Sequence, residues 1–202
     1  MKFVNKMIMV QPAHLEAEIA NKQNSGGELV KKEEKINMSK KKKGNKDGLA
    51  VSLGKQAVIL QASGRLEEAM DLRKKEQKIC EEIGNKNGLA ISLGNQANIL
   101  FDSGRLEEAM QLHKKEQKIC EELKNKDGLS TSLGNQANIS FASGRLEEAM
   151  ELLKKKHKIC EEMGNKDGLQ NSLGNQALIL QLLGRLEEAM ELHKKKQKIC
   201  EE

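Results

Sequence analysis

The chain has 202 residues, of which 37% are hydrophobic and 32% charged, with three Phe and neither Trp nor Tyr. This composition lies between that of ordinary globular proteins and that of disordered ones, and it predicts a thin core. Residues 1–43 carry ten Lys and five Glu, which accounts for the whole net charge of +5 and leaves residues 44–202 balanced. Because nucleic-acid readers normally show a basic stripe on their folded face, a nucleic-acid partner is disfavoured for residues 44–202.

Membrane, metal and cofactor sites are also disfavoured by the sequence. No apolar stretch is long enough to span a membrane, and Phe3–Val10 is too short and polar for a signal sequence, which predicts a cytoplasmic protein without a membrane partner. The four Cys occur singly, without a C-x-x-C pair or a His at ligand spacing. This pattern predicts no metal and no cofactor, and it is typical of reduced thiols buried as small hydrophobic side chains.

The first 43 residues differ in kind from the rest of the chain. They lack its period and contain the lysine run Lys40–Lys43 and the flexible pair Gly26-Gly27, so we predict a basic, largely disordered tail. One alternative stays open, because KKEEKIN from Lys31 resembles KKEQKIC from Lys74 and indicates a degenerate half repeat that forms a helix. No aromatic residue accompanies the lysine run, so a solvated segment is favoured over a nucleic-acid or membrane-surface site.

From residue 44 onward the sequence repeats itself every 40 residues. Gly84–Leu123 and Lys124–Met163 are identical at 29 of 40 positions, which indicates duplication. We therefore divide the chain into four repeats, 44–83, 84–123, 124–163 and 164–202. Because the fourth repeat ends inside a helix without a polar capping helix, we expect it to be truncated and uncapped, as in a fragment of a larger protein.

Each repeat shows two patterns of helical period. In the second repeat, Leu89, Leu93, Ala97 and Leu100 form one apolar stripe of a first helix. We predict that this helix is capped by Asp or Asn and ends at a Ser-Gly pair, Leu183-Gly184 being the variant, whose glycine is left-handed; the predicted caps are Asp47, Asn87, Asp127 and Asp167.

A second helix begins directly after the Ser-Gly turn. Glu107 and Glu108 place negative charge in its first turn, where the helix dipole favours it. Its predicted buried side is interrupted by a polar gap at Lys114–Lys118; that side comprises Leu106, Ala109, Met110, Leu112, Ile119 and Cys120. Neither helix is amphipathic enough to be stable alone in water, so stacking of the repeats must stabilise them.

Helix, glycine turn and helix at this length, with Ala-Met after Gly-Arg-Leu-Glu-Glu, resemble the tetratricopeptide repeat superfamily in a long, 40-residue form. The strings SLGNQANIL and GRLEEAM are similar to those of adaptors with Leu-Gly-Asn repeats, and more loosely to kinesin light chains and bacterial signalling proteins. The resemblance implies an all-α fold, a right-handed α–α superhelix of antiparallel helix pairs. HEAT or armadillo units have a similar period, but they would need proline-bent or three-helix repeats.

The resemblance also implies a binding groove lined by the first helices. In the family, an asparagine at the place of Asn95, Asn135 and Asn175 clamps the backbone of a bound peptide, and an amide suits this role because it both donates and accepts hydrogen bonds. The face opposite the apolar stripe adds further candidates, and the first repeat has Lys55 where the others have the asparagine; these candidates are Asn98, Asn138, Phe101 and Phe141.

Alternatives remain for these residues and for the function. The asparagines could bond across adjacent first helices, and the two Phe could simply pack against the second helix. An enzyme is disfavoured, because no Ser, His and Asp arrangement recurs in a repeat. We therefore predict a non-catalytic scaffold that binds a peptide or protein segment, and the alternative is self-association by stacking of the uncapped ends.

Overall fold

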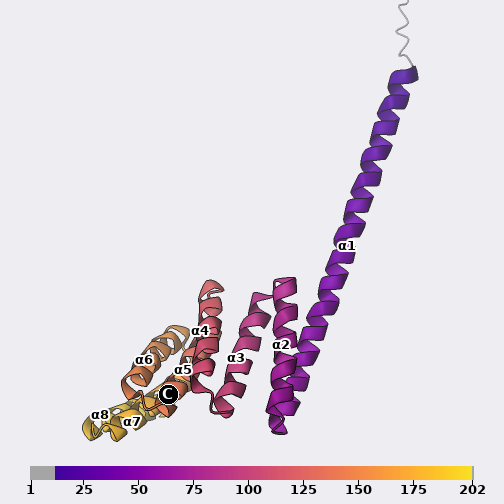
Figure 1. Ribbon diagram of the computed structural model, residues 1–202. Helices are drawn as coiled ribbons and strands as arrows, with labels where there is room; N and C mark the ends of the chain where they lie inside the picture. The colour runs from indigo at the N-terminus through magenta and orange to yellow at the C-terminus, as the bar shows by residue number, and fades with distance from the viewer. Residues whose placement is uncertain (1–11, 202) are drawn as a thin grey trace, which may run out of the picture. The chain divides into compact units, whose positions relative to one another are not determined.

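The computed structural model describes residues 12–201, and this part of the chain is entirely helical (Figure 1). The helices are α1 (Pro12–Ala62), α2 (Leu66–Ile83), α3 (Lys86–Asp102), α4 (Leu106–Glu122), α5 (Lys126–Ala142), α6 (Leu146–Met163), α7 (Lys166–Leu182) and α8 (Leu186–Glu201). The all-α solenoid of helix pairs predicted from the sequence is therefore confirmed. None of the described helices is both long and apolar enough to cross a membrane.

The chain divides into two compact units between Asn45 and Lys46. In the first unit, residues 12–43 are helical, where the sequence predicted either a largely disordered tail or a degenerate half repeat. Lys and Glu are good helix formers, and no proline follows Pro12 to interrupt the helix. Residues 1–11 of the predicted tail lie outside the described part of the chain, and the predicted domain boundaries stay predictions.

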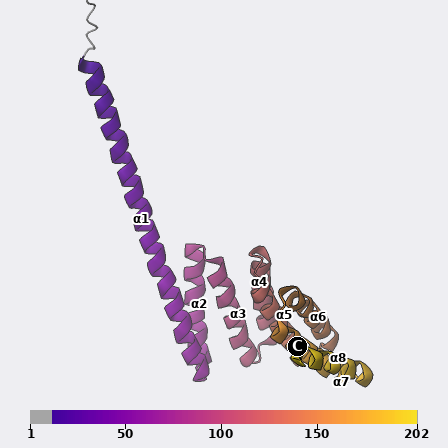
Figure 2. The same ribbon diagram turned by 180° about the vertical axis from the view of Figure 1, so that it is seen from behind.

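The second unit consists of helices that contact their neighbours in chain order, as Figures 1 and 2 show from opposite sides. Contacts within a repeat join α3 to α4, α5 to α6 and α7 to α8, and contacts between repeats join α2 to α3, α4 to α5 and α6 to α7. One apolar cluster spans such a joint, because Ile139 of α5 packs with Ala109 and Met110 of α4. Each hydrophobic cluster therefore depends on two adjacent repeats.

Buried polar groups recur at every joint between repeats. Ser92 Oγ donates to the carbonyl of Arg73 over 2.9 Å, and Ser132 and Ser172 make the same bond to the carbonyls of His113 and Leu153. One helical turn further on, Gln96 Nε2 donates to Gln77 Oε1 over 2.8 Å, and Gln136 repeats this bond with Gln117. We call this set of bonds the polar ladder. It fixes the register of each first helix on the preceding second helix.

From the second repeat onward, the first helices begin two residues earlier than the sequence predicted. Asn85 is the N-cap of α3, and its side chain accepts a hydrogen bond from the Gly88 amide over 2.8 Å; Asn125 and Asn165 do the same in the next repeats. The predicted cap Asn87 therefore lies in the first turn. Asp47, which lies inside α1, accepts a hydrogen bond from Asn85 Nδ2 over 2.8 Å, so this side chain joins two repeats and caps neither.

The glycine turns inside the repeats are left-handed as predicted, with φ of 73° to 74° at Gly64, Gly104, Gly144 and Gly184. The turns between repeats have the same conformation at Gly84 and Gly164, with φ of 67° and 65°. In the equivalent position before the third repeat stands Lys124, the only non-glycine residue with positive φ in the described chain, at 53°. A side chain in this region is sterically unfavourable.

Replacing this lysine tests the strain directly. We expect Lys124→Gly to raise the free energy of unfolding by about 1 kcal/mol, because glycine adopts the left-handed conformation without steric cost. The matched control is the reverse change at the equivalent turn, Gly84→Lys, which should lower stability by a similar amount. Urea unfolding followed by circular dichroism measures both, and equal stability of Lys124→Gly and wild type would contradict the assignment.

Candidate binding groove

The first helices line one side of the repeat array, where α3 contacts α5 directly. Two cavities open on this side, which we call the inner groove. One, of about 420 Å³, lies between residues 47–58 of α1 and α3, and Lys55 and Asn95 line it. The other, of about 510 Å³, lies between α5 and α7, and its lining includes Asn135, Asn138 and Asn175. The structure therefore places five of the eight predicted binding residues in cavities.

Asn98 and the two phenylalanines line neither of these cavities. Asn98 Oδ1 accepts a hydrogen bond from Asn135 Nδ2 over 3.4 Å, which is the kind of bond across adjacent first helices that the alternative interpretation expects. Phe101 and Phe141 are half-buried and pack against the hydrophobic clusters around Met110 and Met150. Their roles as anchors for a ligand remain predictions.

The floor of the inner groove comes from the second helices, which the sequence did not suggest. A methyl group added at Gly54 would lie 2.6 Å from Glu76 Oε1, and one added at Gly134 would lie 3.0 Å from Lys156 Nζ. The glycines of the first helices thus leave room for a long side chain that reaches through from the second helix. We call these side chains the floor residues: Glu76, Glu116, Lys156 and Lys196.

In the first two repeats the floor residue belongs to a buried pair. Arg73 Nη1 lies 2.9 Å from Glu76 Oε2, and His113 Nδ1 lies 2.7 Å from Glu116 Oε2, with all four residues less than 9% exposed. A buried carboxylate needs such a partner, because an unpaired one loses its hydration without compensation. In the second repeat Glu116 lies within the polar gap Lys114–Lys118 and His113 directly precedes it, so the gap was a signal that could have indicated the pair.

In the third repeat the floor changes sign. Leu153 replaces the arginine or histidine, and Lys156 replaces the glutamate. Lys156 Nζ donates to Asn171 Oδ1 over 2.9 Å, and no carboxylate of the described chain lies within ion-pair distance of it. Burial lowers the pKa of this amine, because removal of water penalises its charged form, and the nearby Cys160 opposes the effect only in part. The larger cavity therefore combines an amine with five asparagine amides, and Asp167 also lines it; the asparagines are Asn135, Asn138, Asn165, Asn171 and Asn175.

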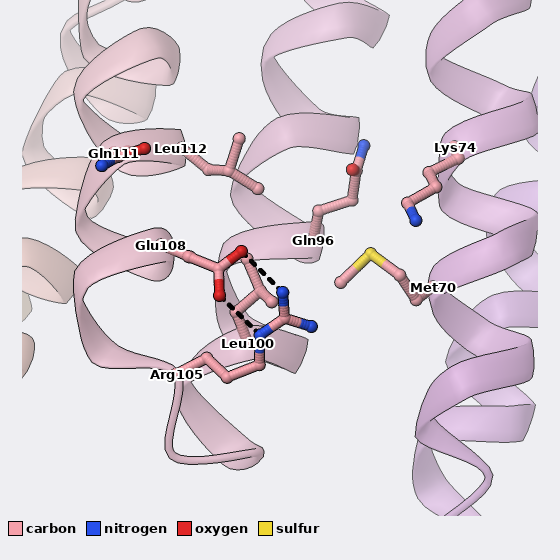
Figure 3. Close-up of a pocket in the computed structure, with 8 residues that line it drawn as sticks. All are labelled: Met70, Lys74, Gln96, Leu100, Arg105, Glu108, Gln111 and Leu112. Atoms are coloured by element: carbon pink, nitrogen blue, oxygen red, sulfur yellow. Dashed lines mark hydrogen bonds and ion pairs between the residues drawn. The ribbon is translucent and has the colours of Figure 1, made fainter.

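A second, smaller groove lies between α2 and α4 on α3, and Figure 3 shows its lining. It encloses about 240 Å³ and adjoins a cavity of about 250 Å³ that shares Met70 and Leu100. Arg105 and Glu108 form a two-bond ion pair at its edge, with Nε and Nη2 at 2.7 and 2.6 Å from the carboxylate oxygens. We call it the outer groove; the sequence did not predict it.

The cysteines and the remaining acidic residues do not assemble a further site. Cys80, Cys120 and Cys160 are buried against the glycines that begin the next first helices, and burial raises the pKa of the Cys80 and Cys120 thiols, with a nearby glutamate adding to the effect. Within residues 12–201, no three His, Cys, Asp or Glu side chains are grouped so as to hold a metal ion.

Comparison with known proteins identifies the type of repeat. A family model described as the MalT-like TPR region matches residues 22–202. No curated protein matches the sequence significantly. Among solved structures, a Podosopora anserina putative kinesin light chain with nearly identical TPR-like repeats has a TM-score of 0.62 at 20% identity, covering 95% of this chain and 97% of that one.

Two bacterial structures are also similar in fold. BtubC (BKLC) from P. vanneervenii has a TM-score of 0.70 at 15% identity, covering 76% of this chain and 64% of its own. Aspartyl phosphate phosphatase F from Bacillus subtilis has a TM-score of 0.74 at 18% identity, covering 77% and 41%. This chain thus spans less than two thirds of either protein, and at these identities the similarity establishes the fold.

The charge reversal among the floor residues can be tested by introducing the Arg73–Glu76 pair of the first repeat at the equivalent positions of the third repeat, Leu153 and Lys156. We expect Lys156→Glu alone to lower the free energy of unfolding by about 1–3 kcal/mol, because a partly buried carboxylate would face no cation. Adding Leu153→Arg should recover much of the loss by restoring the arrangement of Arg73 and Glu76. A double-mutant cycle measured by urea unfolding gives the coupling, and additive effects would contradict the pairing.

Proposed function

This chain belongs to the MalT-like TPR region family, and on that premise we propose that it is a non-catalytic scaffold that binds a peptide or protein segment in its inner groove. The observation that carries the proposal is the cavity between α5 and α7, where Asn135, Asn138 and Asn175 meet around Lys156. Amides and an amine that line a cavity of this size are suited to polar groups of a ligand. We further propose that the protein acts in the cytoplasm.

The arrangement of the amides supports binding that depends little on ligand sequence. Each asparagine offers a donor and an acceptor, so it can pair with a backbone peptide group whatever side chain follows. Asn95 and Asn175 occupy the same position two repeats apart, in the two cavities, and both are partly exposed. An extended segment lying across the first helices would therefore meet similar amides at successive repeats.

The floor residues support a preference in charge. The paired Glu76 presents no net charge to the first cavity, whereas Lys156 lies in the second with only an amide partner among the described residues. A ligand carboxylate near Lys156 would replace the hydration that burial removes, and charge-assisted hydrogen bonds are the stronger kind. We propose that the bound segment places an acidic side chain in the cavity between α5 and α7.

A pull-down from lysate, read by mass spectrometry, tests the groove. We expect the variant with Ala at Asn95, Asn135 and Asn175 to lose partners that the wild-type chain captures, because the backbone contacts are gone. The matched control changes the outer groove instead, with Ala at Lys74 and Gln111, and it should keep them. Circular dichroism must first show equal helicity. Partners kept by the first variant and lost by the control would overturn the proposal.

The charge preference has a separate test. A captured segment, made as a synthetic peptide with Glu, Gln or Lys at each position in turn, is titrated against wild type and Lys156→Met. We expect Lys156→Met to weaken the acidic peptide about tenfold, because one charge-assisted bond is lost, and to leave the Gln peptide nearly unchanged. Equal weakening of the two peptides would show that Lys156 contributes through shape alone.

A further inference from the structure

Two faces of the described chain are halves of one interface that is otherwise always paired. At each joint between repeats, an isoleucine of the first helix packs on the preceding second helix, and Ile99, Ile139 and Ile179 are 1–2% exposed there. Ile59, at the same position of α1, is 66% exposed. On the receiving side, Met110 and Met150 are 4% and 9% exposed, whereas Met190 of α8 is 58% exposed.

We propose that residues 46–62 of α1 in one copy of this chain dock on α8 of a second copy, head to tail, and reproduce the joint between repeats. The occupant follows from continuity with an interface that the fold already contains three times, at α2 with α3, α4 with α5 and α6 with α7. The two open faces carry the same residues as the paired ones, so they are complementary to each other rather than to themselves.

The side chains that form the polar ladder at paired joints are also present at both open faces, in the same conformations. Gln197 Nε2 donates to Glu201 Oε1 over 2.9 Å, as Gln77 and Gln117 do to Glu81 and Glu121, which leaves its Oε1 to accept from a partner. Gln56 Nε2 lies 3.4 Å from Ser52 Oγ, the arrangement that Gln136 and Ser132 have at a paired joint. Docking would let Ser52 donate to the His193 carbonyl and Gln56 to Gln197.

The cysteine and glycine that meet at each paired joint also have unpaired equivalents at the two open faces. At paired joints a Cys Sγ fills the space beside a glycine, and a methyl group added at Gly88 or Gly128 would lie 2.8 Å from Cys80 or Cys120. Gly48 has open space around it, and Cys200 is exposed. Docking would place Cys200 of one copy against Gly48 of the next, where both would match their equivalents at the paired joints.

Such an interface is heterologous, so it does not close on itself. The number of copies in each assembly should therefore grow with protein concentration. Sedimentation velocity over a concentration series tests this. We expect the wild-type chain to form dimers and longer species, and Ile59→Glu and Met190→Glu to weaken association tenfold or more, since each places a charge in an apolar contact. The matched control, Ile91→Glu, changes an isoleucine that is 52% exposed in the inner groove and should associate like wild type.

Mixing the two interface variants distinguishes this arrangement from every symmetric one. Each variant keeps one intact face, so an equimolar mixture should form dimers that grow no further. A wild-type chain that stays monomeric at all concentrations, variants that still associate, or a mixture that stays monomeric would each overturn the proposal. The cavity between α5 and α7 is lined by no residue of 46–62 or of α8, so the titrations of Lys156→Met distinguish failure of peptide binding from failure of self-association.

Cross-linking gives a second measurement that does not depend on weakening the fold. Gly48→Cys, treated with the thiol oxidant diamide, should form a disulfide with Cys200 of another copy and give a ladder of multimers on a non-reducing gel. Adding Cys200→Ser should abolish the ladder. Val58→Cys, 55% exposed in the inner groove, is the control for random collision. A ladder of equal strength from Val58→Cys would overturn the assignment.

Discussion

The joint between one second helix and the next first helix is the interaction on which this structure depends. The first and second helices from α2 onward are 16 to 18 residues long, which is marginal for a helix alone in water. At each joint, burial of one isoleucine is worth roughly 1.5–3 kcal/mol and each buried hydrogen bond about 1 kcal/mol. Because the chain has little aromatic surface to bury, these repeated small contributions replace a single large core.

The polar ladder also explains why the second helices can be so rich in lysine. Their apolar residues are confined to both ends, and the middle turns are held by Ser92 on a backbone carbonyl and by Gln96 on Gln77. These bonds hold the two helices together at this turn and place no demand on the other side chains of the second helix there. The floor position is therefore free to vary, and it holds Glu76 in one repeat and Lys156 in another without altering the stacking.

Features that arise from local patterns recurring along the chain could be predicted from the sequence. Features that depend on contacts between neighbouring helices could not. The period, the helix pairs and the left-handed Gly104 follow from local patterns, and the structure confirms them. The caps were placed two residues late, because Asn85 and Asn87 are equally good capping residues and only the turn at Gly84 decides between them. The floor was missed because sequence separates Glu76 from the glycine above it, Gly54, by half a repeat.

Only some of the residues predicted for the site lie together in a cavity, for a related reason. Asn135 and Asn175 were indicated by the family resemblance and Asn138 by helical periodicity, and these three residues share a cavity. Phe101 has the same spacing but lies one turn further along α3, where α4 approaches and half-covers it. Helical periodicity gives the direction of a side chain and does not give the distance to the next helix, so it cannot separate a groove residue from one at the groove's edge.

The proposed ligand binding and the proposed self-association both depend on how adjacent repeats pack at a joint. Each inner cavity lies between consecutive first helices, one contributed by each of two adjacent repeats. If a second copy docks on α8, its residues 46–62 come to stand beside α7, and a further cavity of this kind forms between Lys55 of one copy and Asn175 of the other. Its floor residue would be Lys196, the equivalent of Lys156. Head-to-tail association would thus lengthen the groove with another basic site, so a long acidic ligand and self-association would favour each other.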